Sequence, residues 1–337
     1  MLDAQGFPAR YGRGLLPELV AGLGSFAVVT HPEPWAVLAP TLPRQPTQLI
    51  AAGDLTPGHL DQLVADLPDV DAVIGIGGGS AMDTAKWLHW RGDVPLYQVP
   101  SLPSVNACFT RMTALRDAGG VRYEGDAVPE AVLVDFDLMA SAPPALVHGG
   151  IGDVLSCHTA RFDWRLGADA GRDYPWDDEQ AAMSLVYLDE LEALAPLLAA
   201  GADDGLRRLM ECHRDIGWRC HELAHARFEE GSEHFFAYTF EEVTGRTIMH
   251  GELVTMGVLV MSAIQGNDPD RPRRIADAAE MRTGLDELGV RWDEVVETLH
   301  RLPSFVEEQG LWWSIANGLT ITDDVIDLAR SALRVEG

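Results

Sequence analysis

Three consecutive glycines, Gly77 to Gly79, followed by Ser80 form the part of this chain best suited to bind a phosphate. The apolar residues 70–76 before them predict a buried strand, and residues 81–90 after them predict a helix. Glycine lets the backbone pass close to a ligand, and a helix N-terminus offers unpaired N–H groups and the positive end of the helix dipole. The pattern therefore indicates a site for a cofactor that carries a pyrophosphate. The other interpretation, a strand–helix turn without a ligand, stays open because such turns are common.

A second group of residues that could do chemistry lies in the other half of the chain: Asp153, His234 and His250. Each of them falls at or next to the predicted start of a helix. One carboxylate and two imidazoles suit Zn²⁺ or Fe²⁺ and leave a position open for a substrate oxygen. Spacing alone does not separate a metal site from chance, because the chain has 11 histidines and an aspartate at a helix start is commonly a cap.

The elements that must position the glycine turn alternate between strands and helices. Strands are predicted at 26–30, 48–51, 72–76 and 96–99, and helices at 15–21, 56–67 and 81–90. This alternation is typical of a parallel sheet wrapped by helices. We therefore predict an α/β N-terminal domain, residues 1–144, with a parallel Rossmann-like sheet. In such sheets ligands bind beyond the carboxyl ends of the strands, which is where the glycine turn falls.

The character of the chain changes at Pro143-Pro144. Before the prolines, an irregular hairpin is expected over residues 110–134, with Gly119-Gly120 as its turn and residues 131–134 as its return strand. After them, long amphipathic helices are predicted at 150–164, 179–198, 206–228, 251–264, 271–288, 292–302 and 322–333. We therefore predict an all-α C-terminal domain over residues 145–337 that binds the metal and the substrate, and an active site in the cleft between the domains.

Composition excludes several classes of protein. The chain of 337 residues has a net charge of −27, which argues against nucleic acid or an anionic membrane surface as a partner. No apolar run approaches the roughly 20 residues that span a bilayer, and the N-terminus lacks the features of a signal peptide, so we expect a cytoplasmic protein. The 4 cysteines include no C-x-x-C pair, which favours reduced, mostly buried thiols. The expected partners are a small-molecule substrate and further copies of the chain in a homo-oligomer, a dimer or higher.

The longer pattern Gly-Gly-Gly-Ser-x-x-Asp-x-Ala-Lys over residues 77–86 resembles the cofactor loop of the iron-containing alcohol dehydrogenase and dehydroquinate synthase superfamily. Residues 150–164, the Gly-Ser-Glu-His of 231–234 and the His-Gly-Glu of 250–252 resemble motifs of the glycerol-1-phosphate dehydrogenases within it. The order of these motifs along the chain places the sequence near the glycerol-1-phosphate dehydrogenase and glycerol dehydrogenase branch.

The resemblance implies where a metal and a cofactor bind. One divalent metal, Zn²⁺ or Fe²⁺, would be held by Asp153, His234 and His250. The cofactor, NAD(H) or NADP(H), would be held by a set of loop residues: Gly77, Gly78, Gly79, Ser80, Asp83, Lys86, Ser101 and Ser104. The pyrophosphate is expected on the glycine turn, and Asp83 on the nicotinamide side. In the family the metal polarises the substrate hydroxyl so that a hydride can leave the carbon toward the nicotinamide.

Departures from the family pattern gather at the presumed substrate end. Asn106 stands where the family has an aspartate, Cys157 where glycerol-1-phosphate enzymes have a lysine, and Tyr238 where relatives often carry a second histidine. We expect Asn106 and Tyr238 to be catalytic residues: Asn106 can hydrogen-bond a hydroxyl but cannot act as a base, and Tyr238 can relay a proton, with simple packing as its alternative. Cys157 lies one helical turn beyond Asp153 and is either a fourth, sulfur ligand or a core thiol.

These departures lead us to the hypothesis that the substrate differs from glycerol 1-phosphate. The hairpin arginines Arg111, Arg116 and Arg122 either bind an anionic group of the substrate or are solvated surface residues. Glu33 follows the strand at 26–30 and is a candidate for the ribose 2′-hydroxyl of NAD(H), but its displacement from the strand end leaves the choice between NAD(H) and NADP(H) open.

The function predicted from the sequence is a metal-dependent, NAD(P)-linked alcohol or polyol dehydrogenase that resembles glycerol-1-phosphate dehydrogenase. It would transfer a hydride reversibly between the nicotinamide and a small hydroxy compound, and both a neutral substrate and a phosphorylated or otherwise anionic one stay open. One alternative is a sugar-phosphate cyclase like dehydroquinate synthase. Those enzymes carry a lysine-rich substrate site, and Lys86 is the only lysine of this chain. The second alternative is a relative that binds the nucleotide without catalysis, against which the intact set of metal ligands argues.

Overall fold

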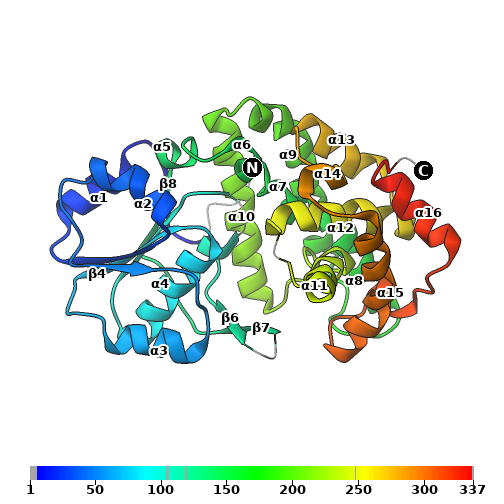
Figure 1. The fold of residues 1–337 in the computed structure, drawn as a ribbon, viewed down its shortest axis with the longest axis horizontal. Coiled ribbons are helices and arrows are strands. Elements are labelled where there is room, and N and C mark those ends of the chain that lie inside the picture. Colours follow the sequence, from blue (N-terminus) through cyan, green and yellow to red (C-terminus); the bar gives the residue numbers. More distant parts are fainter. Residues whose placement is uncertain (1–5, 104–105, 118–119, 247, 336–337) are drawn as a thin grey trace. The chain divides into compact units, whose positions relative to one another are not determined.

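A computed structural model describes residues 6–103, 106–117, 120–246 and 248–335 of the chain (Figure 1). The residues cluster into two compact units. The first contains the chain up to Val147 together with Leu206–Ala224, and the second contains His148–Gly205 and the chain from His225 onward. Within the described residues, no helix is both long and apolar enough to cross a membrane.

The first unit is built on a six-stranded parallel sheet in the order β1-β8-β5-β4-β2-β3. The strands are β1 (Ala9–Gly12), β2 (Phe26–Thr30), β3 (Gln48–Ala51), β4 (Ala72–Gly77), β5 (Leu96–Pro100) and β8 (Ala131–Asp135). Strands β2 and β4 are buried along their whole length, as expected for parallel strands covered on both faces. The predicted α/β class with a parallel sheet is confirmed; β1 is a strand that the sequence did not predict.

Alternate residues of each strand face two different layers of helices. Phe26 and Val28 of β2 pack in one apolar cluster with α1 (Leu15–Gly22) and α2 (Pro32–Leu38). Ala27 and Val29 pack in a second cluster with α4 (Gly79–Gly92), against which α3 (Pro57–Ala65) lies. The period of two residues therefore assigns each side chain of the strand to one layer, and the sheet is covered by helices on both faces.

The hairpin prediction was wrong in its return strand. The two-stranded antiparallel pair consists of β6 (Thr113–Asp117) and β7 (Gly120–Glu124). Residues 131–134 instead form β8, which pairs in parallel with both β1 and β5. The reason is burial: Val132, Leu133 and Val134 form a continuous apolar run, which suits a strand inside a sheet better than the partly solvated arm of a hairpin.

One long helix belongs to the first unit although its sequence lies far beyond the predicted boundary at residue 144. This helix is α10 (Asp203–Leu223), and its residues from Leu206 group with the sheet domain. Trp218 packs edge-on against Phe7 with ring centroids 5.7 Å apart, and Arg214 donates from Nε to the carbonyl oxygen of Phe7 at 2.6 Å. The amphipathic pattern showed that α10 needs an apolar partner, but not which domain supplies it.

The second unit is helical. Its helices are α7 (Ile151–Leu155), α8 (Cys157–Asp169), α9 (Asp178–Ala199), α11 (Ser232–Thr244), α12 (His250–Gln265), α13 (Asp270–Ala278), α14 (Leu285–Leu288), α15 (Trp292–Glu308) and α16 (Asp323–Ala332). Helix α12 is the central one, because it is buried over nearly its whole length and packs on α7, α8, α11, α13 and α16. The single helices predicted at 150–164 and 271–288 are each divided in two in the structure.

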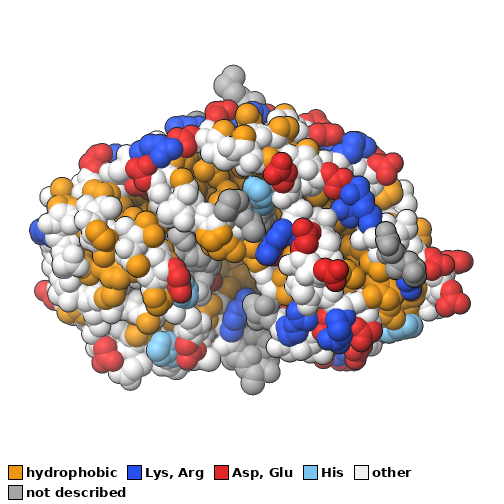
Figure 2. All heavy atoms as spheres, turned by 45° about the horizontal axis from the view of Figure 1, so that its top comes forward, with side chains coloured by type: hydrophobic (Ala, Val, Ile, Leu, Met, Phe, Trp, Pro, Cys, Tyr) orange, Lys and Arg blue, Asp and Glu red, His pale blue; other side chains and the backbone are white. Residues whose placement is uncertain are grey.

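On the face drawn in Figure 2, acidic side chains are scattered among basic and apolar ones rather than gathered in one continuous patch. This distribution agrees with a solvated acidic surface.

Candidate metal centre and phosphate loop

The structure brings Asp153, His234 and His250 together in the second unit. One ligand atom from each lies within 4.8 Å of the others. The Nε2 atom of His250 is 3.4 Å from Oδ1 of Asp153, and the two imidazole centroids are 5.3 Å apart. Asp153 and His234 are buried, whereas the His250 side chain is 36% exposed. One carboxylate and two imidazoles converging on one point, with one side open, suit a divalent metal such as Zn²⁺ or Fe²⁺.

Glycines next to two of these residues explain the convergence. A Cβ atom on Gly152 would overlap the backbone of Gly251, and one on Gly251 would overlap the carbonyl oxygen of Gly149. Helix α7 and the start of α12 can approach this closely only without side chains at these positions. Because Asp153 follows Gly152 and His250 precedes Gly251, the backbone contact places the two side chains side by side.

A third glycine positions the helix that carries His234. A Cβ atom on Gly257 of α12 would overlap the carbonyl oxygen of Glu233. Helices α11 and α12 therefore cross in backbone contact one residue before His234. The sequence motifs contained the first two glycines but did not show that they face each other, and Gly257 carried no signal at all.

Glu233 is a residue whose role the sequence did not show. It is fully buried, and its Oε1 accepts hydrogen bonds from Nδ1 of His234 at 2.8 Å and from the backbone N–H of Gly231 at 2.7 Å. Its Oε2 accepts the hydroxyl of Thr159 at 2.7 Å. Since Nδ1 is engaged with Glu233, Nε2 is the nitrogen of His234 that remains for a metal. A carboxylate behind the histidine is the usual support of a metal-binding imidazole.

The protonation of His234 follows from the same contacts. Burial alone lowers the pKa of this imidazole, but the hydrogen bond and charge of Glu233, with the charges of Glu230 and Asp153, outweigh it and raise the pKa to about 10. A metal ion at this imidazole must therefore displace a proton.

Asp163 joins the start of α11 to the rest of the unit. Its Oδ2 accepts the backbone N–H of Ser232 at 2.8 Å and Nε2 of Gln265 at 3.2 Å, and its Oδ1 accepts the backbone N–H of Ile315 at 2.8 Å. Burial, together with the charge of Glu233, raises the pKa of Asp163 to about 6 in spite of these hydrogen bonds.

Cys157 and Tyr238 differ in their relation to the cluster. Cys157 is fully buried, and the group of clustered ligand atoms found among the described residues does not include its thiol. This favours the core thiol over the fourth ligand. The Tyr238 ring lies 6.1 Å from that of His234, and its hydroxyl donates to Oε1 of Glu230 at 2.9 Å.

The glycine turn of the first unit has the geometry that a phosphate loop needs. Gly77, the last residue of β4, has φ +148, and Gly78 is the N-cap of the 14-residue helix α4. The carbonyl oxygen of Gly78 accepts the N–H groups of Ala81 and Met82 at 3.1 and 3.2 Å. The N–H groups of Gly79 and Ser80 thus precede the first helical hydrogen bonds, and a Cβ on Gly78 would meet only open space.

His31 is a second residue that the sequence did not single out. It follows β2, the strand next to β4, and its Nε2 is 2.8 Å from the hydroxyl of Ser80. Glu33 lies in the first turn of α2 and is exposed. The side chain that follows β2 and contacts the glycine turn is therefore the imidazole of His31, not the carboxylate of Glu33.

Lys86 does not point toward the loop. Its side chain is fully buried, and its ammonium pairs with Oδ1 of Asp83 at 2.7 Å, donates to the hydroxyl of Thr110 at 2.9 Å and donates to the carbonyl oxygen of Met112. All three protons of the ammonium are thus used within the protein. Lys86 positions α4 against residues 110–112, which differs from the direct cofactor contact that the sequence predicted.

The remaining predicted residues lie in the first unit. Ser101 is buried after β5 and donates its backbone N–H to the carbonyl oxygen of Gly77 at 2.9 Å. Asn106 is partly buried in the short 3₁₀ helix Asn106–Phe109. Ser104 lies outside the described residues.

Two of the three hairpin arginines are paired with acids. Arg111 pairs with Asp126 and lies 3.0 Å from Nε2 of His221, and Arg122 pairs with Glu124 at 3.1 Å. Arg116 is exposed. The pairing of Arg111 and Arg122 favours surface ion pairs over an anion site.

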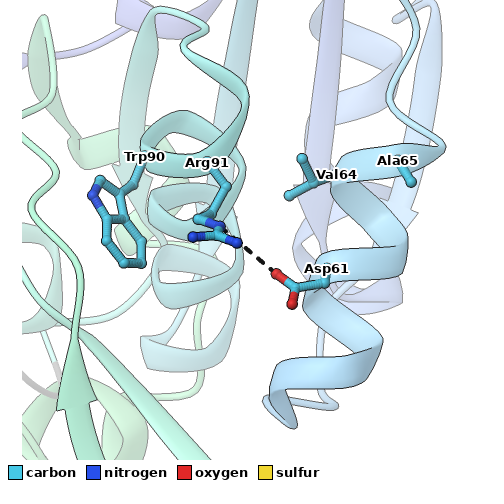
Figure 3. Close-up of a pocket in the computed structure, with 5 residues that line it drawn as sticks. All are labelled: Asp61, Val64, Ala65, Trp90 and Arg91. Carbon is cyan, nitrogen blue, oxygen red and sulfur yellow. Dashed lines mark ion pairs between the residues drawn. The ribbon is translucent and has the colours of Figure 1, made fainter.

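A separate hollow of ≈ 530 Å³ lies between α3 and α4 (Figure 3). It is lined by Asp61, Val64, Ala65, Trp90 and Arg91, and Arg91 pairs with Asp61 at 3.8 Å. None of the residues that line it belongs to the glycine turn or to the metal cluster.

Comparisons with known proteins support the fold. The signature of the iron-containing alcohol dehydrogenase family matches residues 45–143. The glycerol-1-phosphate dehydrogenase [NAD(P)+] of Hyperthermus butylicus is 26% identical over 328 residues, which cover 93% of this chain and 94% of the relative. That of Aeropyrum pernix is 30% identical over 230 residues, which cover 68% and 65%.

Solved structures match over nearly the full length. A probable glycerol dehydrogenase from Sinorhizobium meliloti has a TM-score of 0.72 at 22% identity, with 99% of this chain and 98% of that one covered. Glycerol dehydrogenase from Schizosaccharomyces pombe has a TM-score of 0.73 at 20% identity, with 99% and 91% covered. These matches define the class of the fold: an α/β unit with a parallel sheet joined to a helical unit. In sequence the chain is similar to the iron-containing alcohol dehydrogenase family over residues 45–143, and to glycerol-1-phosphate dehydrogenases over up to 93% of its length.

Proposed function

We propose that this protein is a metal-dependent, NAD(P)-linked dehydrogenase that acts reversibly on the CH–OH group of a small polyol. The observation that carries the proposal is the convergence of ligand atoms from Asp153, His234 and His250 to within 4.8 Å. The relatives named above, glycerol-1-phosphate dehydrogenases and glycerol dehydrogenases, support the same reaction class.

The residues present fit both a metal and a dinucleotide. Asp153, His234 and His250 would hold Zn²⁺ or Fe²⁺, with Glu233 keeping Nε2 of His234 available. The N–H groups at the start of α4 would hold the pyrophosphate, with His31 and Ser101 beside them. An imidazole after β2 in place of a carboxylate leaves room for NADP(H) as well as NAD(H).

Oxidation of an alcohol removes a hydride from carbon and a proton from oxygen. When bound, the metal supplies Lewis-acid stabilisation of the negative charge that develops on the oxygen, and the nicotinamide accepts the hydride. The residues of the chain that can take up this proton are Tyr238 and Glu230, which share a hydrogen bond one helical turn from His234. Tyr238 can accept the proton of the alcohol while its own proton passes to Glu230. We assign Asn106 a hydrogen bond to a substrate hydroxyl, the role that its amide allows.

The test is the absorbance of NADH and NADPH in the presence of a panel of ketones, hydroxyaldehydes and phosphorylated ketones. We expect turnover by Zn²⁺- or Fe²⁺-loaded protein, loss of turnover after chelation, and its recovery on adding the metal back. Asp153→Asn should lose both turnover and bound metal, while the exposed-site variant Glu307→Gln should keep both. Turnover that survives chelation, or stoichiometric metal in Asp153→Asn, would contradict the proposal.

The cyclase alternative is weakened by Lys86. The only lysine of the chain is buried and engaged with Asp83, Thr110 and Met112, so no lysine is left for a phosphate-bearing substrate site. A cyclase would also give no net change in NADH absorbance. The homo-oligomer and the cytoplasmic location remain predictions; sedimentation of the purified chain tests the first.

A further inference from the structure

Glu230 and Tyr238 form a hydrogen-bonded pair beside the metal cluster. Tyr238 follows His234 by four residues on α11, so both side chains lie on one face of the helix. Their ring centroids are 6.1 Å apart. Glu230 precedes the helix, and its Oε1 accepts the Tyr238 hydroxyl at 2.9 Å.

The Glu230–Tyr238 pair is more exposed than Asp153 and His234 of the metal cluster. Asp153 and His234 are 5% exposed, whereas Glu230 and Tyr238 are both partly exposed, as is His250. Glu233 differs from Glu230, because both carboxylate oxygens of Glu233 accept hydrogen bonds from buried donors. Among the described residues, Tyr238 supplies the one hydrogen bond to the Glu230 carboxylate, so its second oxygen remains an acceptor that a ligand can reach.

Arg227, the nearest arginine in the sequence, is close enough for its charge and that of Glu230 to act on each other, but it is buried and offers no contact to a ligand. Arg227 is fully buried, donates from Nη2 to the carbonyl oxygen of Trp313 at 2.7 Å and lies over the Trp312 ring at 5.6 Å. A ligand that reaches the cluster therefore meets the carboxylate and the phenol rather than the guanidinium.

We infer that Glu230 and Tyr238 determine specificity: they select an uncharged polyhydroxy substrate and disfavour its phosphorylated counterpart. Hydroxyl groups of a polyol donate to the free oxygen of Glu230, whereas a phosphate dianion at the same place is repelled by the carboxylate. The inference rests on the proposed function and adds the substrate class to it.

The experiment compares two substrates that differ only in the phosphate, dihydroxyacetone and dihydroxyacetone phosphate, with the metal-loaded protein. We expect kcat/KM to favour dihydroxyacetone. Glu230→Gln keeps the shape and removes the charge, and should reduce the preference about tenfold, mainly through a lower KM for the phosphorylated substrate. The ratio of the two kcat/KM values cancels any common effect of the variant on proton transfer. Glu307→Gln, an exposed carboxylate of α15, is the charge-matched control and should leave the ratio unchanged.

A binding readout accompanies the kinetics. Inorganic phosphate should inhibit Glu230→Gln roughly tenfold more strongly than wild type, and the control as weakly as wild type. If Glu230→Gln does not fold, Tyr238→Phe replaces it. This variant retains the carboxylate, so phosphate should inhibit it as weakly as wild type. Loss of the phenol should lower kcat through the proton transfer assigned to Tyr238 and raise the KM for dihydroxyacetone.

The possible failures are distinguishable. No turnover of any substrate by metal-loaded protein overturns the proposed function, and the inference with it. Turnover with a preference of the wild type for dihydroxyacetone phosphate overturns the inference alone. An unchanged substrate ratio and unchanged phosphate inhibition in Glu230→Gln do the same.

Discussion

Lys86→Met is the perturbation for which the structure gives the clearest energetic expectation. The substitution keeps an unbranched side chain of similar length but removes the charge that pairs with Asp83 at 2.7 Å. It also removes the ammonium donor from the hydroxyl of Thr110 and from the carbonyl oxygen of Met112, whose other hydrogen bond, from the Thr110 hydroxyl, is long at 3.4 Å. Since Lys86 is fully buried and Asp83 is 5% exposed, water cannot replace the lost contacts without opening the structure.

The expected loss of stability in Lys86→Met follows from the Asp83 carboxylate, which stays buried without its partner. Removing one partner of a buried ion pair typically costs about 3–5 kcal/mol, because the other charge stays buried and uncompensated. We therefore expect Lys86→Met to lower the free energy of unfolding of the first unit by about 4 kcal/mol. Adding Asp83→Asn should restore most of it, because an uncharged pair carries little of that penalty.

The pH dependence gives an independent check. Burial already raises the pKa of Asp83 above its ordinary value, with the Lys86 charge opposing the rise. In Lys86→Met the opposing charge is gone, so the pKa of Asp83 rises further. A carboxyl whose folded pKa exceeds its unfolded pKa destabilises the fold above the folded value, and this destabilisation is relieved as the pH falls toward the unfolded value. The gap between wild type and Lys86→Met should therefore shrink as the pH is lowered.

The assay is urea-induced unfolding followed by circular dichroism at several pH values. The matched control is Arg91→Met on the same helix, where an exposed guanidinium lies 3.8 Å from Asp61. Exposed pairs contribute about 0–1 kcal/mol, so this variant should change little. If Lys86→Met is as stable as Arg91→Met, or if its deficit grows in acid, the ammonium does not neutralise a buried Asp83 and the reasoning fails.

Two further predictions concern the second unit and the thiols. Gly251→Ala places a Cβ atom against the carbonyl oxygen of Gly149 and should abolish the thermal stabilisation of the protein by Zn²⁺. The control Gly58→Ala, where the added Cβ meets open space, should keep this stabilisation. Normal stabilisation of Gly251→Ala by Zn²⁺ would show that the glycine contact does not position the cluster. In the native protein a thiol reagent should modify Cys220 alone, because the other three thiols, Cys108, Cys157 and Cys212, are buried, and burial raises the pKa of Cys108 to about 12. Mass spectrometry of the native protein measures the modification. Rapid modification of any of the three buried thiols would contradict the prediction.

The strands of the sheet were the most predictable part of the fold. Predicted residues 26–30 and 48–51 coincide with β2 and β3, and 72–76 falls one residue short of β4. These segments are short apolar runs between glycine, proline and polar residues, so their local pattern determines them. The failures are tertiary: α10 packs with the sheet, and residues 131–134 join the sheet rather than the hairpin. Neither fact is encoded in local periodicity.

The break at Ser156 shows why an apolar spacing typical of a helix does not determine where the helix ends. The apolar spacing continues from 150 to 164, but Ser156 separates α7 from α8. Its hydroxyl donates to the carbonyl oxygens of Asp153 and Glu229 at 2.6 and 2.5 Å. The second acceptor lies 73 residues away in the chain, so the contact that accompanies the break was invisible in the sequence.

The contrast between the metal cluster and Lys86 shows what a motif can and cannot specify. Asp153, His234 and His250 were predicted as a set because each adjoins a recognisable motif, and the structure places their ligand atoms within 4.8 Å. Lys86 also sits in a recognisable motif, yet its ammonium faces Asp83 and residues 110–112. A motif fixes which residue types lie near a site, but a long side chain can satisfy the same spacing by pointing into the core. A charged side chain contacts a ligand only if no partner within the protein binds it instead, and Lys86 has such a partner in the buried carboxylate of Asp83, one helical turn away.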